Sequence, residues 1–311
     1  MKKHKFIVSI ITFSLLVYSF VFIRDTNKVA INTLEVFSKS VLPALLPFLI
    51  LNYLIIKMGL LDLIAYLFQF ISYPLFGISG KGASIFLIGI LNGFPSSAIF
   101  TSLLVKEKKI SEKEGQSLVN AIFFPSFSFI FIIIGGNLKD DLLTLSLAVC
   151  LYLSGLFYLY FRNVNNKEIE KLISFKEAYA SFRESLSKFN FINSLKEAIY
   201  NAFINLLNIA GIMVMFSLPY GILSKFLSEY SSSMISGLIE FSYASITLSN
   251  LAIDNTIKGI SLVFILGFAS LSTIVQASMP LKEAGLSIKS FVKARVTVAI
   301  FASFLLLVML V

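Results

Sequence analysis

Two apolar stretches of this chain contain small polar residues where a membrane helix would ordinarily continue. The first is Gly93-Phe94-Pro95-Ser96-Ser97, which lies inside the apolar run 83–105. Pro95 has no amide hydrogen and disfavours helical backbone at Phe94, so the helix opens there and restarts at Pro95. The restarted helix exposes unpaired N–H groups and the positive end of its dipole, which suits a carboxylate or a phosphate. A Pro-kinked helix whose serines bond their own backbone is the alternative interpretation.

The second stretch is Gly267-Phe268-Ala269-Ser270-Leu271-Ser272 in the run 259–281, and it shares a Gly-Phe-x-Ser core with the first. Upstream of each core lies another matching piece, Leu45-Leu46-Pro47 in one half and Leu206-Leu207-Asn208 in the other. An odd number of predicted crossings separates the two copies, which makes them an inverted repeat. Paired apolar segments interrupted by Gly, Pro and Ser are the best sequence indication of a transporter's midplane binding site.

Hydroxyl and amide groups near the two cores can hydrogen-bond a planar polar ligand. Asn120 precedes Phe124-Pro125-Ser126, an interruption that fits either a second broken helix or a simple kink. Hinges are predicted at Pro43, Pro47 and Pro125, although a proline pair often marks only a helix entrance. The predicted substrate-binding residues are Asn92, Gly93, Phe94, Pro95, Ser96, Ser97, Asn120, Gly267, Ser270, Ser272 and Gln276.

The composition places these stretches in a lipid bilayer. Of the 311 residues, 57% are hydrophobic and only 14% are charged, and the mean hydropathy is +0.87, whereas a soluble domain has about a quarter of its residues charged. Cys150 and His4 are each the single residue of their type, so thiol chemistry, structural zinc and a Ser-His-Asp triad lack the residues they need. We therefore expect no enzyme activity, no cofactor and no metal. The net charge of +9 is attributed to lysines in cytoplasmic loops rather than to nucleic-acid binding.

The hydropathy pattern predicts an all-α, polytopic integral membrane protein with an inverted repeat and broken or re-entrant helices. Segment 1–40 is interpreted as a retained signal anchor, with its apolar run at 6–23 and its N-terminus in the cytoplasm, followed by a connector. Residues 41–161 form the first membrane repeat with extra spans, and residues 198–311 form the second. The predicted spans after the anchor are 41–57, 60–78, 83–105, 117–138, 142–161, 198–223, 259–281 and 291–311.

Two other segments have weaker patterns. Segment 162–197 has apolar residues at helical spacing with charges between them, which predicts an amphipathic linker helix on the cytoplasmic membrane face. The run 233–250 contains Glu240 and several serines, so we expect it to lie flat or partly buried. Strict inversion conflicts with the positive charge of loop 282–295. Either re-entrant Gly-Phe-x-Ser segments or a different insertion of 233–250 resolves this conflict.

Several of these segments resemble one known family. They are LPALLPFLILNYLI, GFPSSAIFTSLLVKEKKISEKEGQSLVN and FPSFSFIF in the first half, and LIEFSYASITLSN and LGFASLSTIVQASMPLKEAGLSIKSFVKAR in the second. Together they make the chain similar to the sporulation integral membrane protein YlbJ (SpoVV) family, within the wider group that carries the nucleoside-recognition or Gate domain. One departure is Ile99, which stands where the family's GYPSGAK-like motif ends in lysine.

The resemblance implies a membrane protein of an endospore-forming bacterium, located in the outer forespore membrane. It also implies a transporter or permease for dipicolinic acid, a small planar dianion, during endospore formation. The alternatives are a nucleoside-type carrier of the Gate-domain group and a non-transporting sporulation scaffold that recruits proteins through segment 162–197. The expected partners are an anionic small molecule, the lipid bilayer and, for the scaffold, other sporulation membrane proteins.

Overall fold

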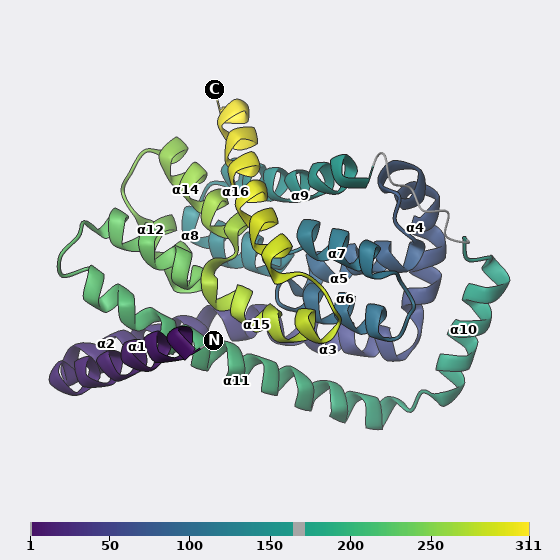
Figure 1. Ribbon diagram of the computed structural model, residues 1–311, viewed down its shortest axis with the longest axis horizontal. Coiled ribbons are helices and arrows are strands. Elements are labelled where there is room, and N and C mark those ends of the chain that lie inside the picture. The colour runs from purple at the N-terminus through teal and green to yellow at the C-terminus, as the bar shows by residue number, and fades with distance from the viewer. Residues whose placement is uncertain (1, 164–171, 311) are drawn as a thin grey trace.

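The computed structural model describes residues 2–163 and 172–310, and all of the regular structure within them is helical (Figure 1). Four segments of the described chain are long and apolar enough to cross a membrane. A pair of helices bent by 87° at residues 58–59 is a fifth candidate span. The chain is therefore an all-α, polytopic integral membrane protein, as the hydropathy pattern predicts. The four segments are α9 (Asp141–Asn163), α11 (Phe191–Leu223), α14 and α15 taken together (Asn255–Glu283), and α16 (Ile288–Leu310).

The bent pair follows the N-terminal helices. The sharp turn between its two members lies at Gly59, whose φ of +77° is in the left-handed region that favours glycine. Pro43 lies in the first turn of the first member, and that helix continues through Pro47. The sharp bend between α3 and α4 therefore lies at the glycine, and the two prolines predicted as hinges lie within α3. The helices of this part are α1 (Lys2–Val21), α2 (Ile23–Val36), the π-helical turn η1 (Phe37–Val41), α3 (Leu42–Lys57) and α4 (Leu60–Phe76).

Two apolar runs of the first half are interrupted helices. The run 83–105 opens after Asn92 and restarts at Ser96, as Pro95 predicts. The run 117–138 also breaks, so the interruption at Phe124-Pro125-Ser126 is a broken helix and not a simple kink. The resulting elements are α5 (Gly80–Asn92), α6 (Ser96–Lys106), α7 (Glu112–Ala121), the π-helical η2 (Phe129–Ile134) and α8 (Gly135–Leu138).

Two runs of the second half are interrupted as well. The run 259–281 breaks at Ala269, within the predicted core, and the weak run 233–250 breaks at Glu240. The predicted linker over 162–197 is not one helix in its described part: residues 162–163 end α9, α10 follows, and residues 191–197 begin the long helix α11. Residues 164–171 lie outside the described ranges. The new elements are α10 (Phe175–Lys188), α12 (Glu229–Ile239), α13 (Phe241–Asn250), α14 (Asn255–Phe268) and α15 (Ser270–Glu283).

The two halves of the chain pack with matching contacts. Helix α7 of the first half contacts α16 of the second half, and α14 of the second half contacts α9 of the first. Helices α9 and α16 also contact each other. Likewise α6 packs on α7 and α15, whereas α13 packs on α14 and on η2 and α8. A crosswise pattern of this kind is expected of two halves related by a twofold axis. It equates α5 and α6 with α12 and α13, and α7 and η2 with α14 and α15.

This register differs from the one predicted from the sequence. The core at Gly93 corresponds to the break at Glu240, and the core at Gly267 corresponds to the break at Pro125. The predicted upstream match between Leu45 and Leu206 agrees with the contacts, because α3 packs on α5 as α11 packs on α12. The repeat therefore contains four interruptions, two in each half, whereas the sequence comparison paired only the interruption at Gly93 with the one at Gly267.

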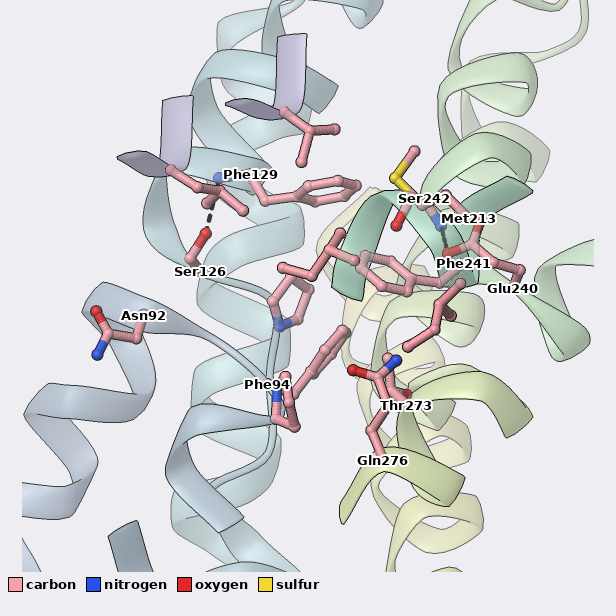
Figure 2. A pocket seen from close by; sticks show the side chains of 16 residues that line it. Asn92, Phe94, Ser126, Phe129, Met213, Glu240, Phe241, Ser242, Thr273 and Gln276 are labelled. Atoms are coloured by element: carbon pink, nitrogen blue, oxygen red, sulfur yellow. Dashed lines mark hydrogen bonds between the residues drawn. The ribbon is translucent and has the colours of Figure 1, made fainter. Parts of the chain in front are cut away.

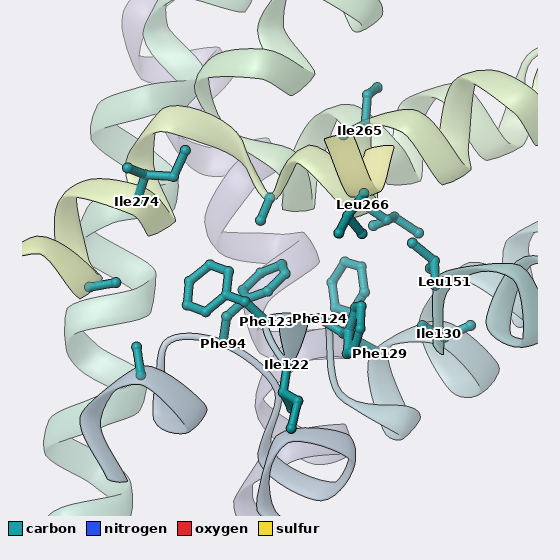
Figure 3. Packing of buried hydrophobic residues seen from close by; sticks show 14 of the residues in the cluster. Phe94, Ile122, Phe123, Phe124, Phe129, Ile130, Leu151, Ile265, Leu266 and Ile274 are labelled. Carbon is teal, nitrogen blue, oxygen red and sulfur yellow. The ribbon is translucent and has the colours of Figure 1, made fainter. Parts of the chain in front are cut away.

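Packed phenylalanines hold the interruptions together (Figure 3). Phe94 stacks on Phe123 with the ring centroids 5.1 Å apart and meets the edge of Phe241 at 4.7 Å, and Phe123 meets Phe291 at 4.9 Å. Each such pair contributes about 0.5–1.5 kcal/mol beyond its buried area. Because lipid tails solvate apolar side chains as well as the protein does, close packing rather than water exclusion fixes the positions of the broken segments.

Candidate substrate-binding site

All four interrupted segments contribute to one small cavity, called here the inner pocket (Figure 2). Its lining includes Phe94 from the α5–α6 break, Ser126 from the segment after α7, Glu240 from the α12–α13 break and Thr273 from α15. The rings of Phe94, Phe129 and Phe241 surround it (Figure 2). With a volume of about 40 Å³ it has room only for water-sized molecules.

The inner pocket adjoins a larger groove that runs along α3, α6 and α11. The groove has a volume of about 600 Å³, which lies within the range of small-molecule sites. Asn92, Pro95 and Gln276 line both cavities, and Asn205 and Asn208 of α11 add amides to the groove. The groove therefore has room for a small organic molecule, and the residues that it shares with the inner pocket lie at one end of that space.

The break between α5 and α6 presents a helix N-terminus to these cavities. Asn92 ends α5, and its side-chain oxygen accepts a hydrogen bond from the amide of Asn52 on α3. The Phe94–Pro95 peptide bond is cis, and α6 begins at Ser96 without a side-chain cap. The first N–H groups of α6 and the positive end of its dipole thus lie beside the groove, as the sequence predicts.

The segment 122–128 crosses this break closely. The amide of Phe94 donates a hydrogen bond to the carbonyl of Phe124 at 2.8 Å, so the two interrupted chains are joined through their backbones. Gly93 has a φ of +68°, and a Cβ atom there would lie 2.4 Å from the backbone nitrogen of Ser126. Only glycine fits this position. Ser126 in turn accepts a hydrogen bond from the amide of Phe129 at 3.2 Å, which starts the next helical turn.

Glu240 forms the break between α12 and α13. Its side chain is 3% exposed, and its two oxygens accept hydrogen bonds from the amides of Ser242 and Tyr243, each at 2.9 Å. The carboxyl group is thus the N-cap of α13 and offsets the positive end of that helix. The residue before the break still belongs to α12, whose last carbonyls end beside the same carboxyl.

The break between α14 and α15 uses left-handed backbone rather than proline. Ala269 and Ser270 have φ values of +70° and +57°. Helix α15 starts without a side-chain cap, and Ser270 and Ser272 bond each other through their hydroxyls at 3.0 Å. Thr273 and Gln276, one turn further along, are the residues of this helix that line the cavities.

The charges of the site are unevenly distributed. Among the described residues that line the inner pocket or the groove, Glu240 is the one charged side chain. The uncapped N-termini of α6 and α15 supply partial positive charge. In residues 2–163 and 172–310 no group of three or more His, Cys, Asp or Glu is arranged to hold a metal ion.

The structure brings part of the predicted set together. Asn92, Phe94, Pro95, Ser96 and Gln276 line the cavities, as does the predicted hinge Pro125.

The remaining predicted residues have other contacts. Ser97 is fully buried outside both linings, and Asn120 bonds Ser290 of α16 at 2.9 Å. Gly93 and Gly267 allow close backbone packing, since a Cβ on Gly267 would lie 2.9 Å from Cα of Ala299. Ser270 and Ser272 bond each other, as described above, and are buried.

Sequence reasoning missed residues contributed by the α12–α13 break, by α13, by α15 and by the segment after α7. Glu240, Phe241, Ser242, Ser126 and Thr273 line the inner pocket but were not in the predicted set. Every break contains phenylalanine followed by serine one or two positions later, but the same pattern also occurs inside continuous helices, at Phe301-Ala302-Ser303 in α16 and at Phe70-Ile71-Ser72 in α4, so it does not by itself locate a break. The four copies at the breaks are Phe94-Pro95-Ser96, Phe124-Pro125-Ser126, Phe241-Ser242 and Phe268-Ala269-Ser270.

Fold and site together define a polytopic helical membrane protein whose discontinuous helices meet at an internal pocket. The chain is similar to the sporulation integral membrane protein YlbJ of Bacillus subtilis (strain 168), with 26% identity over 294 residues that cover 85% of this chain and 72% of the relative. This similarity confirms the resemblance to the YlbJ family of sporulation membrane proteins; the wider Gate-domain grouping stays a prediction. No protein-family model matches the chain, and no solved structure matches it.

Proposed function

We propose that this protein is a secondary transporter for a small organic anion and that its substrate is dipicolinate. The observation that carries the proposal is the meeting of four helix interruptions at one pocket, with the N-termini of α6 and α15 uncapped beside it. Broken apolar helices of this kind are the usual construction of transporter binding sites. Helix N-termini favour a carboxylate, and the amides of Asn92 and Gln276 can hydrogen-bond the rest of a planar ligand.

The relative supports the cellular setting of the proposal. A protein named for sporulation and for its place in a membrane fits a role in endospore formation. We place the protein in the outer forespore membrane with its N-terminus in the cytoplasm, and propose that it needs no enzyme activity of its own.

Glu240 favours a second candidate, a carrier of nucleoside-like molecules. A buried carboxylate repels a dianion but accepts hydrogen bonds from hydroxyl groups, and no lysine or arginine of the described chain lines the cavities to offset it. Ile99, where the family motif has lysine, lines the groove as an apolar residue. The two candidates differ in substrate and not in mechanism.

Uptake by proteoliposomes separates the candidates. Vesicles with the purified full chain should accumulate labelled dipicolinate, and excess unlabelled dipicolinate should compete while uridine does not. The variant Gln276→Leu removes a lining amide and should weaken apparent affinity about tenfold. Ser278→Ala is the matched control, because Ser278 lies on the same helix and bonds only the carbonyl of Ile274. Uptake of uridine without dipicolinate would favour the second candidate, and uptake of neither would overturn the transport proposal.

A further inference from the structure

We infer that Glu240 binds a monovalent cation, H⁺ or Na⁺, which occupies the inner pocket when the substrate anion enters the groove. The inference rests on the proposed function, since it concerns the ion coupled to the same transport. Binding of an anion does not account for a carboxylate in the lining of the site, yet Glu240 lies there.

Glu240 is buried without a cationic partner. It is 3% exposed and lines the inner pocket, and among the described residues no ion pair includes it. Its carboxyl oxygens accept hydrogen bonds from the backbone amides of Ser242 and Tyr243 and from the hydroxyl of Ser242. An ionised carboxylate has about four acceptor positions, and these donors fill three of them. The remaining position is available to a small cation on the pocket side.

The two helices that meet at Glu240 present opposite ends of their dipoles. The carboxyl group caps the positive N-terminus of α13, and α12 ends at Ile239, so its last carbonyls and the negative end of its dipole lie at the residue before Glu240. Half-helix C-termini and unwound carbonyls are the groups that coordinate Na⁺ or H⁺ in transporters with broken helices. The volume of about 40 Å³ suits a proton carried by water or a small ion and excludes an organic substrate.

The neighbouring titratable groups do not supply the missing charge. The ring of Tyr243 meets that of Tyr220 of α11 edge to face, with the centroids 5.2 Å apart, and neither residue carries a positive charge. Glu283 of α15 pairs with Lys106 at 3.0 Å, away from the pocket lining. The titratable residues of α12, α13 and the helices packed against them are Lys196, Glu197, Tyr200, Tyr220, Glu229, Tyr230, Tyr243, Lys258, Lys282 and Glu283.

Charge balance then couples the two ligands. With Glu240 ionised, the carboxylate opposes an anion in the adjoining groove, because both lie in a medium of low dielectric constant. With a cation on Glu240, that repulsion is removed and the N-termini of α6 and α15 dominate the local potential. Cation binding therefore raises anion affinity, and anion binding raises cation affinity by the same factor.

Cation binding is tested first without transport. Thermal unfolding of the purified full chain is measured in NaCl against choline chloride at fixed pH, and across pH in Na⁺-free buffer. A ligand that binds only the folded protein raises its midpoint. The wild type and Glu229→Gln should show the same shift with Na⁺ or with acid, whereas Glu240→Gln should lose it. Glu229 is an exposed residue in the first turn of α12 and serves as the matched control. A Glu240→Gln protein that folds and shifts as the wild type does overturns the inference.

Transport provides the second readout. Dipicolinate uptake is driven by an inward Na⁺ gradient at equal pH or by an inward proton gradient without Na⁺, with the membrane potential held at zero. One coupled cation and a tenfold gradient should give about tenfold accumulation in the wild type, and none in Glu240→Gln. Uptake that ignores both gradients contradicts the coupling while leaving the proposed function intact. A lack of dipicolinate uptake under every condition contradicts the proposed function, and the unfolding experiment still decides whether Glu240 binds a cation.

Discussion

Arg295 of α16 donates a hydrogen bond from Nη1 to the backbone carbonyl of Phe123 at 2.6 Å, although the two residues are 172 positions apart in the chain. Its other terminal nitrogen bonds the carbonyl of Asn120, and the guanidinium lies over the ring of Phe123 at 5.7 Å from the centroid. The carbonyl of Asn120 belongs to the last turn of α7, where helical partners are missing, and the carbonyl of Phe123 belongs to the non-helical segment that follows. A fully buried arginine thus completes the C-terminus of a broken helix.

Replacing Arg295 by methionine should destabilise the protein strongly. Two buried carbonyls lose their donors, and each unsatisfied group costs about 1–3 kcal/mol, so we expect a loss of about 2–6 kcal/mol in the free energy of unfolding. Arg295→Lys should retain only part of that energy, because an ammonium group lacks the fork that reaches both carbonyls. Thermal unfolding in detergent measures both. Lys293→Met, an exposed change on the same helix, is the control, and a midpoint for Arg295→Met equal to that of the control would contradict the assignment.

Gly93→Ala should separate the two broken chains at the pocket. The added Cβ would lie 2.4 Å from the nitrogen of Ser126, and the φ of +68° is strained for alanine. We expect a loss of about 1–3 kcal/mol in the free energy of unfolding, together with reduced uptake. Gly136→Ala in α8 is the control, since nothing lies within 4 Å of a Cβ there, the residue lines neither cavity and alanine favours the helix. Equal stability of the two variants would count against this packing.

Gln69→Leu should release helix α10 from α4. The side chain of Gln69 donates to the carbonyl of Ile173 at 2.7 Å and accepts from its amide at 2.8 Å, so it pairs the start of the linker with the membrane helix beside the hydrogen bond from Ser181 to Asp62. Losing both bonds should raise local opening roughly tenfold or more, seen as faster hydrogen exchange in 175–188. Ser187→Ala is the control, because Ser187 bonds only the carbonyl of Glu184 within α10. Unchanged exchange in Gln69→Leu would show that other contacts dock the helix.

Where a break rests on local backbone chemistry, the sequence predicts it. Pro95 removes an amide and restricts Phe94, so the end of α5 and the start of α6 follow from neighbouring residues alone. The break at Glu240 contains no proline or glycine. It depends on Glu240 itself, whose backbone is extended and whose carboxylate caps α13. Such a cap competes with a continuous helix, and the packing of α12 and α13 on other helices decides between them.

Side-chain direction after a break is harder to predict. Ser270 and Ser272 were expected to face the ligand, but Ala269 and Ser270 adopt left-handed backbone and thereby set the rotation of α15. This rotation turns Thr273 and Gln276 toward the cavities and leaves the two serines bonded to each other. The sequence contains no local signal for left-handed alanine, so tertiary packing determines which polar residues line the site.

Cysteine labelling tests whether the groove is open to solutes. The single cysteine, Cys150, is fully buried in α9, so the native chain should react slowly with N-ethylmaleimide. In a Cys150→Ala background, Ser96→Cys places a thiol in the lining of the groove, whereas Ser102→Cys places one on the same helix at a position that is 2% exposed. We expect roughly tenfold faster labelling at position 96, because access limits the reaction of a buried thiol. Dipicolinate should slow labelling at position 96 and leave position 102 unchanged. Equal rates at both positions would mean that the groove is closed to solutes, and the ligand would then have to enter through a conformation in which α6 and α11 are further apart.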